Sequence, residues 1–238
     1  MMTRYFWAGL AVTAAVGALW GAKADAAAKA ASRVLFDGTR TDAWRAFKRD
    51  AFPSKGWAVE NGTLKPVVGG DRVDLVTKDT YRDFDLELEW KVGPSGNSGV
   101  MYDVAETEAE TYHTGPEMQV LDDAGHQDGK NPKTSAGALY ALIAPSAKVV
   151  KPAGEWNQAR IVKKGAHVEH WLNGTKIVEY ELGSPALAAL IAGSKFKEWP
   201  RFARQGQGHI VLQHHGDPAW FRNVRITGTP VKAKRQLR

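Results

Sequence analysis

Two short stretches carry side chains that could act together on a substrate. They are TGPEMQVLDD, residues 114–123, and LQHHGDPAWFRN, residues 212–223. If the first is a strand, Glu117 and Gln119 point to the same face, because successive side chains of a strand alternate. A carboxylate beside an amide can exchange a proton and bind hydroxyl groups. A simply solvent-exposed face is the alternative that this pattern leaves open.

The second stretch places two histidines side by side. The same alternation puts His215 on one face with Gln213, and His214 on the other face at the end of an apolar row. We therefore expect His215 to belong to a polar site, with a purely structural histidine as the alternative for either residue. Arg222 follows a Gly-Asp-Pro turn, where its guanidinium could hold a carboxylate or a sugar hydroxyl.

Most common catalytic motifs are missing from this chain. It has no G-x-S-x-G, no H-E-x-x-H, no phosphate-binding glycine loop and no cysteine. An ordinary glycosidase uses two carboxylates, whereas the alternate positions of the first stretch hold Glu117 and an amide. Asp122, Asp123 and Asp128 lie in a loop-like stretch, and oxygen-rich loops can bind calcium. Their spacing matches no fixed calcium motif, so a metal site is neither indicated nor excluded by these residues.

A β-sandwich is the structure that must position these side chains. DFDLELEWKV, residues 83–92, alternates apolar and charged residues, which is typical of an antiparallel strand with one buried face. Many short strands and turns follow, among them Asn173-Gly174, the preferred pair of a type I′ turn. The one convincing helix lies around 185–198, with Ser184 as N-cap and Pro185 at its first position. The pattern predicts an all-β jelly-roll sandwich of two antiparallel sheets.

The two ends of the chain differ from this sandwich. Residues 1–26 have a basic start, an apolar middle and Ala-x-Ala sites, which predicts a cleavable signal peptide and a periplasmic or secreted protein. A single membrane anchor is the alternative, but the apolar run is shorter than the ~20 residues of a span. Residues 27–231 would form one domain and 232–238 a basic tail.

The positive charge of this chain does not indicate a nucleic-acid partner. The formal net charge is +6, and much of it lies in the terminal segment VKAKRQLR rather than on a folded face. We therefore expect no nucleic-acid partner and no stable membrane insertion after signal cleavage. The oligomeric state is left open.

Five motifs, taken in order, resemble the 3-keto-disaccharide hydrolase family. They are NSGVMYD, TGPEMQVLDD with KNPKTSAGALYALI, GEWNQARIVKKGAHVEHWLNG, SKF and HIVLQHHGDPAWFRNVRI. The resemblance covers about Val34 to Thr227. It implies a concanavalin A-like fold and an exported enzyme that cleaves glycosides oxidised to a ketone at carbon 3. Some members resemble lyases or hydratases, and a divalent metal is implicated in some. His214 stands where the family usually has Asp.

The resemblance implies a reaction that needs only one base. A ketone at carbon 3 acidifies the proton on carbon 2, and the enolate left by its removal can expel the group on carbon 1, after which water adds back. Glu117 and His215 are then the catalytic residues, and either could be the base. A metal near the keto oxygen could act as a Lewis acid. The residues expected to bind substrate are Gln119, Gln213, Arg222, Tyr140, Asp122 and His214.

Two functions of other classes remain as alternatives. A sandwich of this kind can be a non-catalytic, lectin-like sugar-binding module, because fold does not determine function. A structural or surface interaction protein, in which the face that carries Glu117 and Gln119 is simply wet, is the third possibility.

Overall fold

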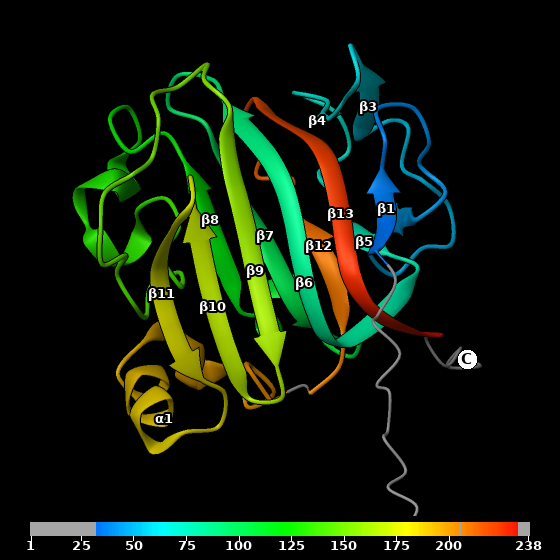
Figure 1. The fold of residues 1–238 in the computed structure, drawn as a ribbon. Coiled ribbons are helices and arrows are strands. Elements are labelled where there is room, and N and C mark those ends of the chain that lie inside the picture. Colours follow the sequence, from blue (N-terminus) through cyan, green and yellow to red (C-terminus); the bar gives the residue numbers. More distant parts are fainter. Residues whose placement is uncertain (1–31, 205, 233–238) are drawn as a thin grey trace, which may run out of the picture.

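The computed structural model describes residues 32–204 and 206–232, which form two antiparallel sheets packed face to face (Figure 1). The signal peptide expected at 1–26 lies outside the described residues, as does the basic tail beyond Lys232. Within the described part of the chain, we find no helix with the length and apolar character that a membrane crossing requires.

The larger sheet has eight strands in the order β11-β10-β9-β6-β13-β4-β3, with β1 paired to β13. They are β1 (Ser32–Phe36), β3 (Trp57–Glu60), β4 (Thr63–Pro66), β6 (Asp79–Val92), β9 (Asn157–Lys164), β10 (His167–Leu172), β11 (Thr175–Glu181) and β13 (Ala219–Lys232). The smaller sheet has five, in the order β2-β5-β12-β7-β8. They are β2 (Trp44–Ala46), β5 (Leu75–Thr77), β7 (Asn97–Val104), β8 (Glu117–Leu121) and β12 (His209–Leu212).

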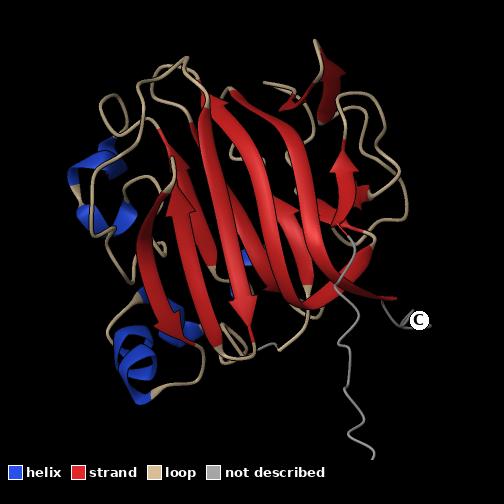
Figure 2. Cartoon of the chain, in the orientation of Figure 1, coloured by secondary structure: helices blue, strands red, loops and turns tan. Residues whose placement is uncertain are grey.

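The helical segments are short and lie outside the two sheets (Figure 2). They are η1 (Thr111–His113), η2 (Gln127–Lys130), η3 (Pro132–Thr134), α1 (Pro185–Ala192) and η4 (Lys195–Glu198). The helix expected around 185–198 is thus divided. Ser184 caps its start by accepting the amide of Leu187 at 3.1 Å, but α1 ends before Gly193, whose residue type disfavours helix continuation. Ser194 then caps the separate turn η4.

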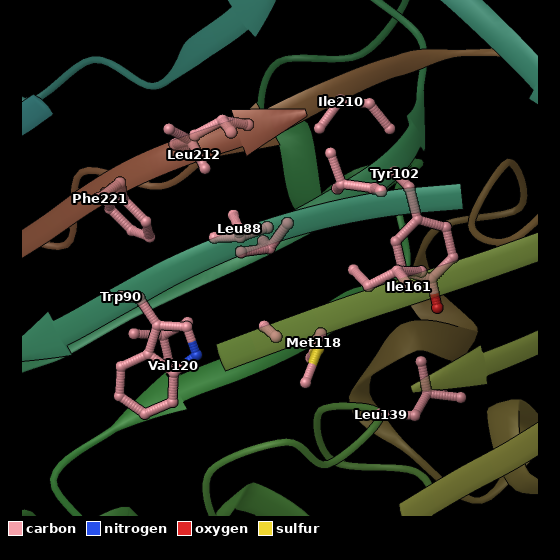
Figure 3. Packing of buried hydrophobic residues seen from close by; sticks show 14 of the residues in the cluster. Leu88, Trp90, Tyr102, Met118, Val120, Leu139, Ile161, Ile210, Leu212 and Phe221 are labelled. Atoms are coloured by element: carbon pink, nitrogen blue, oxygen red, sulfur yellow. The ribbon is translucent and has the colours of Figure 1, made fainter. Parts of the chain in front are cut away.

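The core fills the space between the two sheets, as the alternation of β6 predicted. The charged row of that strand is partly or fully exposed, whereas its apolar row is buried throughout. The apolar row consists of Phe84, Leu86, Leu88, Trp90 and Val92. Figure 3 shows Leu88 and Trp90 of the larger sheet with Met118 and Val120 of the smaller one. Each such side chain contributes roughly 1.5–3 kcal/mol on burial, so this interface holds the sheets together.

The packing of Met118 and Val120 decides where their neighbours on β8 point. Because these two side chains face the core, Glu117 and Gln119 must face the opposite, outer side of the smaller sheet. That side is covered, since the two residues are only 7% and 1% exposed. The alternative of a simply wet face is therefore wrong.

Candidate active site

A cavity of about 170 Å³ lies on this outer side of the smaller sheet. β8 supplies its most deeply buried wall, and the segments that follow β12 and α1 close it. Its lining residues are Asn97, Tyr112, Glu117, Gln119, Tyr140, Lys195, Phe196, Gln213 and His215. Five of the residues expected from the sequence, two as catalytic and three as substrate-binding, thus share one cavity.

Glu117 is the most unusual group in the cavity. Its burial, together with the negative charges of Asp74 and Asp128, raises the pKa of the carboxyl to about 8, and the Lys195 ammonium only partly opposes this. No hydrogen bond contributes to that pKa, so no protein donor is bonded to the carboxyl group. Such a carboxyl is protonated at neutral pH and can lose its proton within the physiological range.

Gly99 makes the room that Glu117 occupies. It lies on β7, where it pairs with Gln119, and a Cβ at this position would lie only 2.0 Å from Oε1 of Glu117. Any larger residue would push the carboxyl group out of its place. The neighbouring strand is therefore shaped to accept this side chain.

The amide and phenol groups of the cavity are held by their own partners. Nε2 of Gln119 donates to the carbonyl of Thr134 at 3.2 Å. Tyr140 is positioned through its backbone amide, which donates to the Glu117 carbonyl at 3.0 Å, and its hydroxyl donates to Asp128 at 3.3 Å. The Lys195 ammonium lies 4.5 Å from the centre of the Tyr140 ring, which places a positive charge at the cavity wall.

His215 forms a pair with Asp217. Nδ1 of His215 lies 2.8 Å from Oδ2 of Asp217, and because an ionised carboxylate only accepts hydrogen bonds, Nδ1 donates to it. Nε2 is then left to act on a ligand in the cavity. The guanidinium of Arg72 donates to the backbone carbonyl of the same histidine. Both contacts fix the segment that follows β12.

Three of the expected binding residues lie elsewhere. His214 is buried in the other direction, with its ring edge-on to Trp57 at 5.8 Å, so it follows the alternation that separates it from His215. Asp122 accepts the amides of Ser95 at 2.8 Å and of Ala124 at 3.2 Å and therefore braces a loop.

Arg222 is the third expected binding residue that lies outside the cavity. It lies on β13 of the larger sheet, where it pairs with Glu89 at 2.6 Å and lies over the Trp156 ring at 4.0 Å. Its partners are strand neighbours that the motif alone did not reveal. Neither Arg222 nor His214 nor Asp122 lines the cavity.

Comparison with known proteins identifies the family to which this site belongs. The model of the family described as the 3-keto-alpha-glucoside-1,2-lyase-like domain matches residues 31–227. The chain belongs to this family. A curated relative named 3-keto-disaccharide hydrolase, from Bacteroides thetaiotaomicron, is 34% identical over 222 residues, which cover 81% of this chain and 76% of the relative.

Solved structures agree with the family and with the concanavalin-like sandwich. A protein of Parabacteroides distasonis, provisionally named a glycosyl hydrolase, is 33% identical and superposes with a TM-score of 0.76, over 83% of this chain and 94% of its own. A second protein from the same organism, named in the same way, has 29% identity and a TM-score of 0.64, over 84% of this chain and 100% of its own.

Several residues of the cavity were not singled out from the sequence. Lys195 and Phe196 belong to the family motif SKF, which offered a signal. Asp217, which does not line the cavity but pairs with His215, stands two residues after it, a spacing that suits a side-chain pair. Asn97 begins the family motif NSGVMYD, which also offered a signal, whereas Tyr112 carried none beyond its residue type. The last two reach the cavity only through the packing of the smaller sheet with η1.

The divalent metal implied for some members of the 3-keto-glucoside lyase-like family does not fit the described residues of this cavity. A resident ion takes three or more strong protein ligands, and the cavity offers one carboxylate and one imidazole beside neutral amides. Asp122 and Asp123 are bound to backbone amides, and Asp128 accepts from Tyr140. The loop aspartates thus do not converge, and no step is assigned to a metal.

Among the residues that the structure describes, one group on the larger sheet, outside the cavity, has metal-like spacing. His167, Glu169 and Glu179 offer ligand atoms within 4.8 Å of one another. Lys176 already bridges the two glutamates at 3.3 Å and 2.6 Å. An ammonium group therefore occupies the position that a cation would take.

A larger hollow, of about 650 Å³, lies on the outer face of the larger sheet. It is an open strand surface, and two of the charged side chains along it are paired, Arg160 with Asp85 and Glu89 with Arg222. Size alone would favour this hollow as the active site. Of the two, however, only the smaller cavity is lined by a buried carboxyl group with a raised pKa, that of Glu117. We therefore place the candidate active site of this family member at Glu117.

Proposed function

We propose that this chain is an exported carbohydrate-active enzyme that cleaves 3-keto-glycosides, with Glu117 as its general base. One observation carries the proposal: a buried carboxyl group without a hydrogen-bond donor, with a pKa of about 8, sits beside neutral amides in a cavity. A base works best when its pKa lies near the working pH. The names of the relatives support a carbohydrate substrate and a hydrolase.

The first step is removal of the proton on carbon 2 of the substrate. The Glu117 carboxylate takes the proton, and the electron pair of the C–H bond moves toward the ketone oxygen at carbon 3 to give an enolate. Only the ionised carboxylate can do this, so the rate should rise with pH through about 8. The rise is expected to follow a single ionisation.

The enolate oxygen needs positive charge or hydrogen-bond donors. Lys195 is the only lysine or arginine among the residues that line the cavity, and its charge also acts on Glu117. A cation beside developing negative charge in a partly buried site lowers the barrier. Gln119 and Gln213 provide amides for the remaining hydroxyl groups of the sugar.

The second step breaks the bond between carbon 1 and the leaving oxygen. As the enolate pair returns to form the C1–C2 double bond of an enone, the leaving oxygen takes up a proton, which we assign to Nε2 of His215 in the form of the ring that carries a proton on each nitrogen. Asp217 holds this ring in the required orientation through its contact with Nδ1. Addition of water to carbon 1 and return of a proton to carbon 2 complete a net hydrolysis.

The test is turnover of a 3-keto-glucoside in deuterated water, with the products identified by NMR. We expect deuterium at carbon 2 of the product. Glu117→Gln should lower kcat by roughly 10²–10⁴-fold, the range typical of general acid–base groups, and His215→Ala should also lower it. Glu87→Gln on the opposite sheet removes a carboxylate outside the cavity and is the matched control.

Three other outcomes are informative. Wild-type rates in folded Glu117→Gln and His215→Ala would exclude these assignments. Binding over hours without product would favour the lectin-like module. Loss of turnover on adding a chelator, restored by a divalent ion, would show that a metal takes part although the described cavity residues do not form a strong ligand set.

A further inference from the structure

A cluster of aromatic side chains borders the cavity and takes no part in the steps above. It consists of Tyr112, His113 and Trp199, and we call it the aromatic wall. The His113 and Trp199 rings stack with centroids 4.6 Å apart and planes at 24°. Tyr112 packs edge-on against both, at 4.7 Å from His113 and 5.3 Å from Trp199. All three are only partly buried.

The aromatic wall is continuous with the cavity. Tyr112 itself lines it, and so does Phe196, whose ring lies 5.7 Å from Trp199. The wall therefore extends from the cavity lining to the surface. Glu117 and Gln119 are far more deeply buried than the wall, which places the reacting centre at the bottom and the aromatic rings nearer the entrance.

Hydrogen bonds hold the wall in place from both of its segments. The hydroxyl of Thr111, next to Tyr112, donates to Asp74 at 2.5 Å, and Asp74 also accepts the backbone amide of His214 at 2.8 Å. The amide of Ala203 donates to the Thr114 carbonyl at 2.9 Å and ties the segment after η4 to the segment after η1. The rings are thus preorganised.

The size of the cavity explains why such a wall is needed. At about 170 Å³ it is well below the ~300–1,000 Å³ of pockets that enclose a drug-sized ligand. A glycoside with two rings cannot fit inside, so the group leaving from carbon 1 must extend toward the entrance. The Lys195 ammonium lies over the rings of Tyr140 and Phe196 in the cavity lining, whereas among the described residues no cation lies over a ring of the aromatic wall.

We propose that the aromatic wall is the aglycone subsite and that it selects 3-keto-glycosides whose leaving group is a ring with an apolar face. This inference rests on the proposed function. The ring packs against Tyr112, which His113 and Trp199 hold from behind, by the offset and edge contacts that aromatic groups prefer. An aryl group and the apolar face of a second sugar present the same chemistry.

The test compares three 3-keto-glucosides, with methyl, phenyl and glucosyl leaving groups, in the wild type and in Tyr112→Leu. For each substrate, kcat/KM of the variant is divided by that of the wild type, which cancels differences in leaving-group ability. We expect the ratio for the ring-bearing substrates to fall about tenfold below the ratio for the methyl glycoside. The phenyl and glucosyl arms show which ring the wall prefers.

Two further variants separate stacking from folding. Tyr112→Phe keeps the ring and should restore the wild-type ratios, and Trp171→Leu removes a partly buried tryptophan on the larger sheet and should not change them. Equal ratios for all three substrates in Tyr112→Leu would overturn the proposal.

Measurements of affinity test the aglycone subsite independently of turnover. The affinities of the same glycosides for Glu117→Gln, measured by calorimetry with and without the Tyr112→Leu change, should show the same preference for ring-bearing leaving groups. If no substrate is cleaved but this preference remains, the proposed function fails and the subsite stands. If substrates are cleaved but neither rates nor affinities depend on the wall, the subsite fails alone.

Discussion

The cavity can be compared with a second cluster of buried polar side chains, in the core between the two sheets. There the hydroxyl of Tyr102 lies 2.8 Å from Nε2 of His170 and 2.6 Å from the hydroxyl of Tyr180. Nδ1 of His170 donates to the Gly137 carbonyl at 3.1 Å. Burial lowers the pKa of this histidine to about 4 and keeps it neutral. Each group of the core cluster has a partner.

Glu117 is buried to a similar degree but has no such partner, and it borders a cavity. Buried polar groups that are paired make the fold specific, whereas an unpaired one costs stability. A protein retains a group that lowers its stability in this way where the group has a function. Pairing, more than burial, distinguishes the structural cluster from the candidate active site.

The largest effect should come from breaking a pair in the core. Lys163 is fully buried; its ammonium lies 3.1 Å from Asp103 and donates to the Arg82 carbonyl at 2.6 Å. Lys163→Met should lower the free energy of unfolding by about 3–5 kcal/mol, because it leaves a buried carboxyl and carbonyls without their cation. Urea unfolding measures this.

Lys164→Met is the matched control, since it removes the same charge from the exposed neighbouring position. A cost no larger for Lys163→Met than for Lys164→Met would mean that the pair is not structural. The effect should also depend on pH. Burial raises the pKa of Asp103 to about 7 despite Lys163, so the attraction between the two groups weakens as the pH falls below 7.

Replacing the unpaired carboxyl group of Glu117 should raise stability, the opposite of the effect expected at Lys163. The folded-state pKa of Glu117 is raised to about 8 from 4.5, so the folded chain holds a proton that the unfolded chain has lost, and stability falls as the pH rises between these values. Glu117→Gln abolishes this loss. It should raise Tm by several degrees at pH 8.5, at roughly 2–4 °C per kcal/mol, and by little at pH 4.5.

Glu106→Gln provides the contrast for this pH series. Glu106 accepts from Arg45 at 2.6 Å and 2.7 Å, and these contacts hold its pKa below the usual value although burial opposes them. Its contribution is present above the unfolded-state pKa and is lost as the pH falls. The variant should therefore lower Tm at neutral pH. A fall in Tm for Glu117→Gln as well would show that Glu117 has a partner in solution.

Local patterns predicted much of this structure, because they depend on neighbours in the chain. The alternation in 83–92 identified the buried face of β6, and Asn173-Gly174 forms the expected turn with both φ angles positive, 49° and 81°. Alternation also separated His214 from His215, although β12 itself ends at Leu212 and both histidines follow it.

The remaining features depend on contacts between distant segments. Lys195 lines the same cavity as Glu117 only because the segment after α1 folds over the outer face of the smaller sheet. No periodicity in the sequence predicts this fold of the segment. The pairing of Arg222 with Glu89 depends on the register of β13 against β6, which a single strand pattern does not contain. A motif can therefore be recognised correctly while one of its residues lies outside the cavity that the others line.

Arg222 gives the smallest expected effect and the sharpest test of this distinction. Its pair with Glu89 is partly exposed, with side chains 38% and 21% accessible, so Arg222→Ala should cost only about 1 kcal/mol in the free energy of unfolding. It should leave kcat/KM for a 3-keto-glucoside within twofold of the wild type, whereas Gln213→Ala, which removes an amide from the cavity, should lower it several-fold. A tenfold loss of kcat/KM in folded Arg222→Ala would show that Arg222 contributes to substrate binding. Pairing with Glu89 would then not distinguish a structural charge from a functional one.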